Sequence, residues 1–319
     1  MKRLIIFTLC LALLLPVSAC QGGEETRVYT LNGTTGCGMA PLICDAKEID
    51  AKGDYAFTVL DDPLEVRDAV INGTADIAAV PTNVASALFN ATNGGVKVLA
   101  LNTGGVLHLV TTEKHVNSFA ALAATQTLFV PAQTPAFIMN AILEKVAVQN
   151  FMLDSTTYQK PADLRDALVN GLVKNAILPE PLASTAVQKT AASASPARAV
   201  LDLTELWEKY YEKGSLVQGC VVVRTEYLEK NPEKVALFLE EYEKSIRYVK
   251  KNTDDAAEMI VEANIIDDVA IAKAALPKCN LMFVTGEPMK TALSAFLATM
   301  PPKSIGGTLP SDDFYFIPS

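Results

Sequence analysis

The residues of this chain best suited to binding a small molecule gather at turns between short apolar runs and helical patterns, and on one later strand. Their side chains are hydroxyls, amides and one carboxylate, which hold polar ligands by hydrogen bonds. Helix N-termini add unpaired N–H groups at the turns. The residues that we predict to contact a ligand are Thr34, Thr35, Gly36, Thr82, Asn83, Gln133, Thr134, Glu180, Gln218 and Gly219.

Each of these residues also has a purely structural interpretation. Thr82 is suited to cap a helix, and the other turn threonines can bond to their own backbone. Asn83 and Gln133 can be solvated, and Glu180 can complement a helix dipole. Gln218-Gly219 can serve hinge geometry alone. Both interpretations stay open at this point.

Nothing in the sequence indicates catalysis. It has no GxSxG elbow, no P-loop and no HExxH, and Gly36-x-Gly38 lacks the third glycine of a dinucleotide fingerprint. Glu180 has no second titrating group beside it, and the two histidines, His108 and His115, are too few for a multi-histidine metal site. We predict His108 to be a packed hinge residue and the ligand-facing turns to contain no Arg, Lys or aromatic ring. The prediction is a protein that is not an enzyme and has no cofactor or metal.

Composition bounds the class of protein. The 319 residues are 50% hydrophobic, which is enough for a large core and about two domains. With 27 Lys and Arg against 36 Asp and Glu, the formal net charge is −9. An acidic surface repels phosphate backbones, so we expect no nucleic-acid partner.

The first residues have the pattern of an export signal. Met1-Lys2-Arg3 is followed by an apolar run from Leu4 to Leu15 and a small-residue segment ending at Cys20. The run is shorter than a membrane-spanning helix needs. The end of the segment resembles a bacterial lipobox, so we predict a signal peptide over 1–19 and a lipidated tether over 20–26, with the lipid on Cys20. The alternative is an ordinary signal cut near Ala19.

Four other cysteines remain in the predicted mature chain: Cys37, Cys44, Cys220 and Cys279. If residues 38–47 are helical, Cys37 and Cys44 lie about two turns apart, beyond disulfide reach. We interpret these residues as buried thiols. A long-range disulfide involving Cys220 or Cys279 stays open, because an exported chain can meet an oxidising compartment.

An internal repeat indicates two lobes of similar build. Residues 63–88 and 161–186 align without a gap at an offset of 98, with ten identical positions. Each copy reads as a helix opened by Pro and closed by Asn-Gly, then an apolar strand and a second helix. Further strands are predicted at 27–31, 127–130, 96–101, 106–112 and 216–224, and helices at 231–250, 254–264 and 288–299.

These elements predict an α/β fold of two lobes joined by two crossover strands. We assign 27–109 and 220–319 to the first lobe and 110–219 to the second. The chain would bend at 106–112 and 216–222. In open α/β sheets, ligands bind beyond the carboxyl ends of the strands, where the predicted polar turns lie.

The order of the lipobox, the Asp-x-Pro-Leu-Glu-Val block with AVINGTADIA, the VPTN turn and the LPEP turn resembles the solute-binding proteins of ABC importers. The specific resemblance is to the branch that binds alkanesulfonates, nitrate, taurine and thiamine-pyrimidine precursors, and it spans about 27–300. It implies the type II periplasmic-binding-protein fold, and that the turn at Glu180 faces the ligand.

The resemblance also implies partners and a location. They are a small solute, an ABC permease with its ATPase, and a bacterial cell membrane facing the periplasm or exterior, to which the lipid anchors a monomer. Glu180 favours a small polar organic ligand with a donor group. Two alternatives stay open: a module that presents its solute to a sensor, and an enzyme like the menaquinone-pathway lyases, which share the fold but act in the cytosol.

Overall fold

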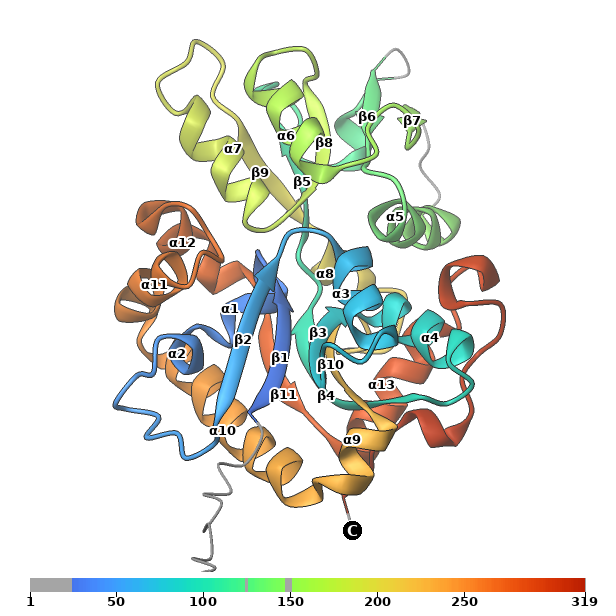
Figure 1. The fold of residues 1–319 in the computed structure, drawn as a ribbon. Helices are drawn as coiled ribbons and strands as arrows, with labels where there is room; N and C mark the ends of the chain where they lie inside the picture. Colours follow the sequence, from blue (N-terminus) through green and yellow to red (C-terminus); the bar gives the residue numbers. More distant parts are fainter. Residues whose placement is uncertain (1–24, 124–125, 147–150, 319) are drawn as a thin grey trace, which may run out of the picture.

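The computed structural model describes residues 25–123, 126–146 and 151–318. Within these ranges the chain forms two mixed sheets flanked by helices, which lie at opposite ends of the molecule (Figure 1). The predicted α/β class with two lobes is confirmed. We call the larger part, built on the sheet that contains β1, lobe I and the other part lobe II.

In the described ranges, the sheet of lobe I has six strands. In spatial order they are β11 (Leu281–Val284), β4 (Val96–Gly104), β10 (Val217–Arg224), β3 (Ile77–Pro81), β1 (Thr26–Leu31) and β2 (Tyr55–Leu60). Strands β1, β2 and β3 are parallel, whereas β10 runs antiparallel to both β3 and β4. The two central strands are buried on both faces, which matches their continuous apolar sequences.

Helices cover both faces of this sheet. They are α1 (Thr34–Cys37), α2 (Ala40–Ile43), α3 (Pro63–Ile71), α4 (Thr82–Ala91), α9 (Thr225–Lys230), α10 (Pro232–Lys251), α11 (Thr253–Glu262), α12 (Val269–Ala275) and α13 (Gly286–Leu297), with 3-10 turns η2 (Leu276–Lys278), η3 (Pro302–Ile305) and η4 (Asp312–Phe314). Residues 38–47 do not form one helix, because α2 spans only Ala40–Ile43 and Cys37 ends the separate helix α1, so the condition used to place Cys37 and Cys44 two turns apart is not met.

Lobe II repeats the plan on a smaller scale. Its strands, in spatial order, are β7 (Met152–Asp154), β6 (Thr127–Phe129), β8 (Asn175–Pro179), β5 (Leu107–Thr111) and β9 (Arg198–Asp202). Its helices are α5 (Thr134–Lys145), α6 (Pro161–Val169) and α7 (Leu182–Thr190), with the 3-10 turn η1 (Phe119–Ala121).

The internal repeat has a direct structural counterpart. Helices α3 and α6 both begin at a proline, and Gly73 and Gly171, which follow them, have the same φ of 73°. Only glycine adopts that left-handed backbone without strain. Each lobe also pairs its parallel strands with an antiparallel one that comes from the other half of the chain: β10 beside β3, and β5 beside β8.

The chain passes between the sheets at two places. Strand β4 ends at Gly104 and β5 begins at Leu107, and the return runs from β9 through α8 (Leu203–Trp207) to β10. The predicted bends at 106–112 and 216–222 largely fall inside β5 and β10, whose residues are paired within their sheets. Residues 105–106 and 203–216 join the lobes instead, and the lobe boundaries stay a prediction.

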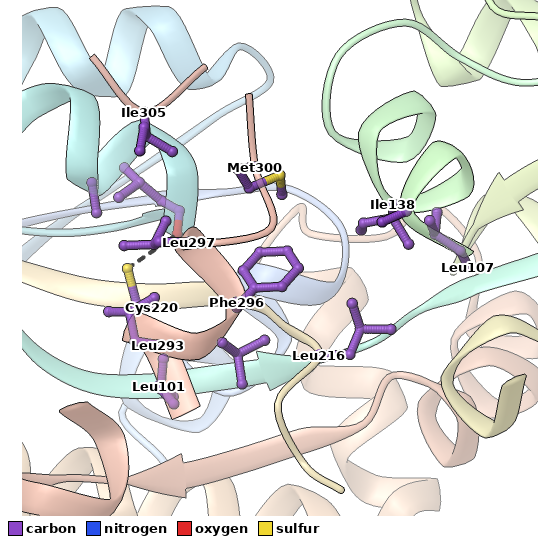
Figure 2. Close-up of a cluster of buried hydrophobic side chains, with 14 of the residues drawn as sticks. Leu101, Leu107, Ile138, Leu216, Cys220, Leu293, Phe296, Leu297, Met300 and Ile305 are labelled. Atoms are coloured by element: carbon purple, nitrogen blue, oxygen red, sulfur yellow. Dashed lines mark hydrogen bonds between the residues drawn. The ribbon is translucent and has the colours of Figure 1, made fainter. Parts of the chain in front are cut away.

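A continuous apolar cluster runs through the joint between the lobes (Figure 2). In lobe I, Phe296 of α13 packs among buried side chains of β4 and β10. Leu216 of the return crossing, Leu107 of β5 and Ile138 of α5 carry the same cluster into lobe II. The hydrophobic effect therefore stabilises the joint as well as each lobe.

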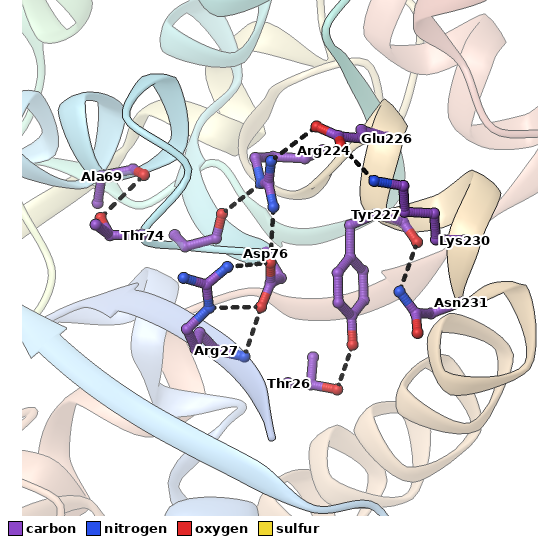
Figure 3. Close-up of polar contacts among 11 residues, drawn as sticks. Thr26, Arg27, Ala69, Thr74, Asp76, Arg224, Glu226, Tyr227, Lys230 and Asn231 are labelled. Atoms are coloured by element: carbon purple, nitrogen blue, oxygen red, sulfur yellow. Dashed lines mark hydrogen bonds and ion pairs between the residues drawn. The ribbon is translucent and has the colours of Figure 1, made fainter. Parts of the chain in front are cut away.

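At one end of the lobe I sheet, a buried carboxylate joins three strands (Figure 3). Asp76 precedes β3 and is 2% exposed. It accepts hydrogen bonds from the Arg27 side chain at 2.6 and 2.8 Å and from Arg224 at 3.0 Å. Burial alone would raise the pKa of Asp76, but the hydrogen bonds and charges of the two arginines outweigh it and lower the pKa.

Candidate functional site between the lobes

Two helix starts from opposite lobes meet in a direct hydrogen bond. Strand β3 leads into α4, and β6 leads through a short turn into α5, so both helices start beyond the carboxyl ends of parallel strands. The Thr134 hydroxyl on α5 donates to Asn83 Oδ1 on α4 across 3.1 Å. The Asn83 amide also donates to the Ser304 carbonyl at 3.5 Å. The structure thus brings together Asn83 and Thr134, two of the predicted ligand contacts.

The turn before α1 lies opposite the turn before α7. A Cβ atom placed on Gly33 would lie 3.6 Å from Cδ of Pro181, which follows Glu180. Gly33 caps α1 with φ 77° and ψ −156°, a conformation open to glycine. The turns next to the predicted contacts Thr34 and Glu180 therefore approach each other at this second place.

The three predicted ligand contacts in α1 differ in their solvent exposure. Thr34 is 8% exposed and Thr35 is half-buried. The Thr35 carbonyl accepts a hydrogen bond of 3.1 Å from Asn102 on β4. At Gly36 a Cβ would lie 2.1 Å from the Leu31 carbonyl oxygen, so only glycine fits against β1. Gly36 thus permits the close approach of the α1 backbone to the strand.

Thr82 does not cap its helix, and that structural interpretation is wrong. Pro81 occupies the N-cap position and Thr82 is the first helical residue. The Thr82 side chain is fully buried and donates to the Val217 carbonyl at 2.9 Å. Its hydroxyl proton is therefore used to hold α4 against β10.

Gln133 adopts a backbone that side chains rarely tolerate. It caps α5 with φ 67° and ψ −129°, close to the conformation of Gly33 before α1. Gln133 is exposed, so its side chain lies at the surface of the turn. Strained non-glycine residues of this kind cluster at binding sites.

Glu180 is the charged residue of the predicted set, and only 2% of it is exposed. It accepts hydrogen bonds of 3.1 Å from both the backbone N–H and the hydroxyl of Ser184, in the first turn of α7. The carboxylate thus satisfies part of the helix start, as the structural interpretation predicted. The Glu180–Pro181 peptide bond is cis.

Lys278 reaches Glu180 from lobe I. Its ammonium group lies 3.7 Å from Glu180 Oε1 and donates to the Ser184 hydroxyl at 3.2 Å. The predicted turns contain no lysine of their own, but the structure brings this one to Glu180 from η2. No motif surrounds Lys278; α12 packs against α7, and η2 follows α12 and packs on it, which brings Lys278 to this place.

His108 also lies beside the Glu180 carboxylate. The prediction of a packed hinge residue did not include this polar contact. The residue is 6% exposed, and its Nε2 lies 3.7 Å from Glu180 Oε1. Burial lowers the pKa of His108, against the opposing charges of Glu180 and Asp202. In the described part of the chain, His108 Nε2 and Thr30 Oγ1 are the buried side-chain polar atoms without a hydrogen-bond partner. Such atoms are uncommon in folded proteins and mark places where a ligand or water is expected.

Gln218 and Gly219 lie at the joint. Gln218 Oε1 accepts a hydrogen bond of 2.8 Å from the backbone of Val106, which lies in the first crossing. A Cβ on Gly219 would lie 2.5 Å from Asn102 Oδ1, so glycine is needed beside β4. Both observations agree with hinge geometry, and ligand contact by this pair stays a prediction.

No group of three or more potential metal ligands occurs among the described residues. Surface cavities of about 320 and 350 Å³ are lined by residues of α5 and β7 and by residues of α10 and β11, and none of these is a predicted contact. No helix in the described ranges is long and apolar enough to cross a membrane. The predicted signal peptide and Cys20 lie outside those ranges.

Solved structures share this architecture. An ABC transporter protein from Parabacteroides distasonis is 22% identical, with 93% of this chain and 99% of that chain covered and a TM-score of 0.77. The periplasmic aliphatic sulphonate-binding protein SsuA from Escherichia coli is 13% identical, with 93% of each chain covered and a TM-score of 0.69. A ligand-binding component of an ABC-type import system from Staphylococcus aureus, solved with zinc, is 13% identical, with 92% of this chain and 97% of that chain covered and a TM-score of 0.68.

At these identities the likeness establishes the fold, so the predicted resemblance to periplasmic solute-binding proteins is confirmed at that level. A search of the curated proteins gave no match. A family model described as "Menaquinone biosynthesis" matches residues 40–298, from α2 in lobe I through lobe II to α13. Since this match takes in both sheets apart from β1, the chain belongs to the menaquinone biosynthesis family, whose members have the periplasmic-binding-protein fold.

Proposed function

We propose that this chain is an exported solute-binding protein. It captures a small polar organic molecule between its lobes and delivers it to an ABC permease and its ATPase, while a lipid on Cys20 holds it at the cell membrane. The fold shared with ABC-type binding proteins and the polar helix starts of both lobes support this function.

One observation carries the proposal. Two buried polar atoms, His108 Nε2 and Thr30 Oγ1, have no hydrogen-bond partner among the described residues. His108 follows the first crossing, whereas Thr30 lies at the end of β1 in lobe I. A ligand that satisfies groups from both lobes binds the closed arrangement best, and it therefore shifts the population toward closure.

The contacts of Glu180 support a more specific proposal for the chemistry of the ligand. Both oxygens of Glu180 already accept hydrogen bonds from Ser184, and Lys278 stands beside them. The sequence favoured a ligand with a donor group, on account of Glu180. With Lys278 present, we propose that the ligand also carries an acceptor, which pairs with this lysine.

A thermal-shift panel tests the proposal. The purified protein is mixed with sulfonates, nitrate, taurine, pyrimidines, polyamines, amino acids or nucleosides. A ligand at about one hundred times its dissociation constant adds roughly 2.7 kcal/mol to the free energy of unfolding, a shift of several degrees. The proposal expects one chemical class to shift the midpoint, and a panel without any shift contradicts it.

A matched pair of lysine variants places the ligand. Lys278→Met is expected to reduce the ligand-induced shift, whereas Lys273→Met is expected to keep it. Lys273 is a suitable control because its side chain is 40% exposed, against 43% for Lys278, and it pairs with Asp254 within lobe I. An equal loss of the ligand-induced shift in both variants would show that the ligand does not bind beside Lys278.

A second candidate is an enzyme of menaquinone biosynthesis on the same fold. The family match over residues 40–298 favours it, and the predicted export signal opposes it. Mass spectrometry of a ligand recovered after incubation distinguishes the two. An unchanged mass supports binding and delivery, and conversion of the ligand supports the enzyme. Uptake lost on gene deletion distinguishes import from presentation to a sensor.

A further inference from the structure

The buried carboxylate of Glu180 lies between two basic side chains that come from different lobes. His108 lies on β5 in lobe II, and Lys278 ends η2 in lobe I. His108 Nε2 and the Lys278 ammonium group each lie 3.7 Å from the same oxygen, Glu180 Oε1. The Glu180 side chain is fully buried, whereas the Lys278 side chain is 43% exposed. One carboxylate oxygen therefore faces a titratable ring in its own lobe and an ammonium group from the other lobe.

The His108 ring can change its charge where it lies. Its side chain is 7% exposed, and burial lowers its pKa, so the neutral ring is favoured in the described arrangement. In the described part of the chain, Nε2 has no hydrogen-bond partner, and 3.7 Å is too long for a hydrogen bond to Glu180. A proton gained in mild acid would turn the ring into a second cation beside the carboxylate. The atom that faces Glu180 is thus able to respond to pH.

The charged groups that act on His108 divide between the lobes. Glu180 follows β8 and Asp202 ends β9, and both strands belong to the sheet that contains His108. Glu205 lies in α8, on the return crossing. These carboxylates favour the protonated ring, and Lys278 opposes it. Of these groups, Lys278 is the one from lobe I, so it is the one that leaves His108 when the lobes separate.

Lys278 links the two lobes while the ring is neutral. Besides lying near Glu180, it donates to the Ser184 hydroxyl at 3.2 Å. Ser184 is in α7, and α12, which precedes η2 in lobe I, packs against α7 (Figure 1). A positive charge on His108 would offset the charge of the carboxylate and repel the ammonium group, since both cations lie at one oxygen. Protonation therefore weakens the attraction between Lys278 and lobe II.

We propose that protonation of His108 loosens the contact between Lys278 and Glu180, so that mild acid opens the lobes and favours release of the ligand. The inference deepens the proposed function and rests on it, because the lobes that open enclose the proposed ligand. In the open arrangement His108 keeps its carboxylate neighbours and loses the lysine, so its pKa is higher there and the open form binds the proton more tightly. The ratio of open to closed protein therefore increases as the pH falls, by at most about tenfold per pH unit for one proton.

Small-angle scattering during a pH titration tests the proposal. The purified protein, without added ligand, is measured between about pH 7 and 5, the range in which histidine titrates. Circular dichroism at each pH checks that the protein stays folded. The wild-type radius of gyration is expected to increase as the pH falls and to return when the pH is restored. A constant radius in the folded protein would overturn the proposal. Because no ligand is added, a ligand panel without a hit contradicts the proposed function and leaves this measurement unaffected.

Variants at the contact assign the response to its groups. His108→Asn has no titrating ring and is expected to keep one radius throughout the titration, whereas His115→Asn, at an exposed position, should respond as the wild type does. Lys278→Met removes the cation that the protonated ring repels, so its radius should also be independent of pH, in contrast to Lys273→Met. A wild-type response in either His108→Asn or Lys278→Met would overturn the proposal. If His108→Asn does not fold, the two lysine variants still decide the question.

Discussion

His108 is a titratable side chain held inside the joint between the lobes, with Glu180, Asp202, Glu205 and Lys278 around it. Burial lowers its pKa, so the folded state favours the neutral ring. In the unfolded chain, His108 has the ordinary histidine pKa of about 6.5. The unfolded chain therefore binds more protons than the folded protein in the acid range. Stability should therefore fall as the pH drops below about 6.5, until the folded pKa is passed.

His108→Asn is expected to lose this acid-dependent part of the unfolding free energy. Urea titrations between pH 7 and 5, roughly the range in which histidine titrates, measure it. His115→Asn, at an exposed position, is the control and should keep the wild-type dependence. Identical pH profiles for wild type and His108→Asn would show that another group causes the dependence.

Gln133 allows a test of backbone strain. Its φ of 67° with ψ of −129° is natural for glycine only. Relief of that strain exceeds the entropy that an added glycine loses on folding, so Gln133→Gly should stabilise the protein by about 1 kcal/mol. Asn140→Gly, within α5, should destabilise it by a few tenths of a kcal/mol or more. A lower urea midpoint for Gln133→Gly would contradict the strain argument.

Residue by residue, the sequence predicted part of the candidate site. The polar turns were visible because Asn83 and Thr134 follow apolar strands, and the structure joins them in one hydrogen bond. Lys278 could not be predicted, because it comes from a segment without a motif and reaches lobe II through the packing of α12 on α7. Thr82 looked like a cap, but the proline before it takes that position.

Among the elements, the ends of three strands depend on Asp76. It binds Arg27 of β1 and Arg224 of β10 from its place before β3. Asp76→Asn removes the negative charge that accepts these hydrogen bonds, and it should lower the free energy of unfolding by about 2 kcal/mol. Asp68→Asn is a matched control, since its pair with Arg67 is exposed and should contribute at most about 1 kcal/mol. Equal effects in the two variants would refute the role of Asp76.

The Asp76 carboxylate also makes the free energy of unfolding depend on pH in the acid range. Since the folded pKa of Asp76 is lowered, its contribution is complete above the unfolded value of about 3.9 and is lost as the pH falls through the folded pKa. This window lies below that of His108, so the two contributions are separable. Circular dichroism during acid titration should show that the wild-type protein unfolds at a lower pH than Asp76→Asn.

The internal repeat made most helices and strands predictable. The positions at which the chain crosses between the lobes were not predictable from it. Pro63 and Pro161 start their helices as expected, because proline suits the first helical turn. The sequence predicts bends at 106–112 and 216–222, which fall largely inside β5 and β10, because a run of apolar residues does not reveal which sheet it will join. Backbone pairing assigns β5 wholly to lobe II and β10 wholly to lobe I.

At the scale of the whole molecule, the described arrangement has both lobes in contact. Two of the polar contacts between them are the hydrogen bond from Thr134 to Asn83 and the hydrogen bond from Lys278 to Ser184, beside which Lys278 also pairs with Glu180. Removing both, in Thr134→Val with Lys278→Met, should favour an open arrangement. Small-angle scattering is expected to give a larger radius of gyration than for Lys273→Met, and a ligand should reverse the difference. An equal radius in the two proteins would mean that the apolar joint alone holds the lobes.

Strand β10 also determines when the protein can fold. It lies between β3 and β4, yet it is made about 110 residues after β4, because the whole of lobe II comes first. Until β10 emerges from the ribosome, β3 and β4 each present an unpaired edge, which invites aggregation or capture by a chaperone. The strands of lobe II, by contrast, all lie within one unbroken stretch, Leu107–Asp202. The smaller lobe can therefore assemble during synthesis, while the larger one cannot close its sheet until its middle strand has been made.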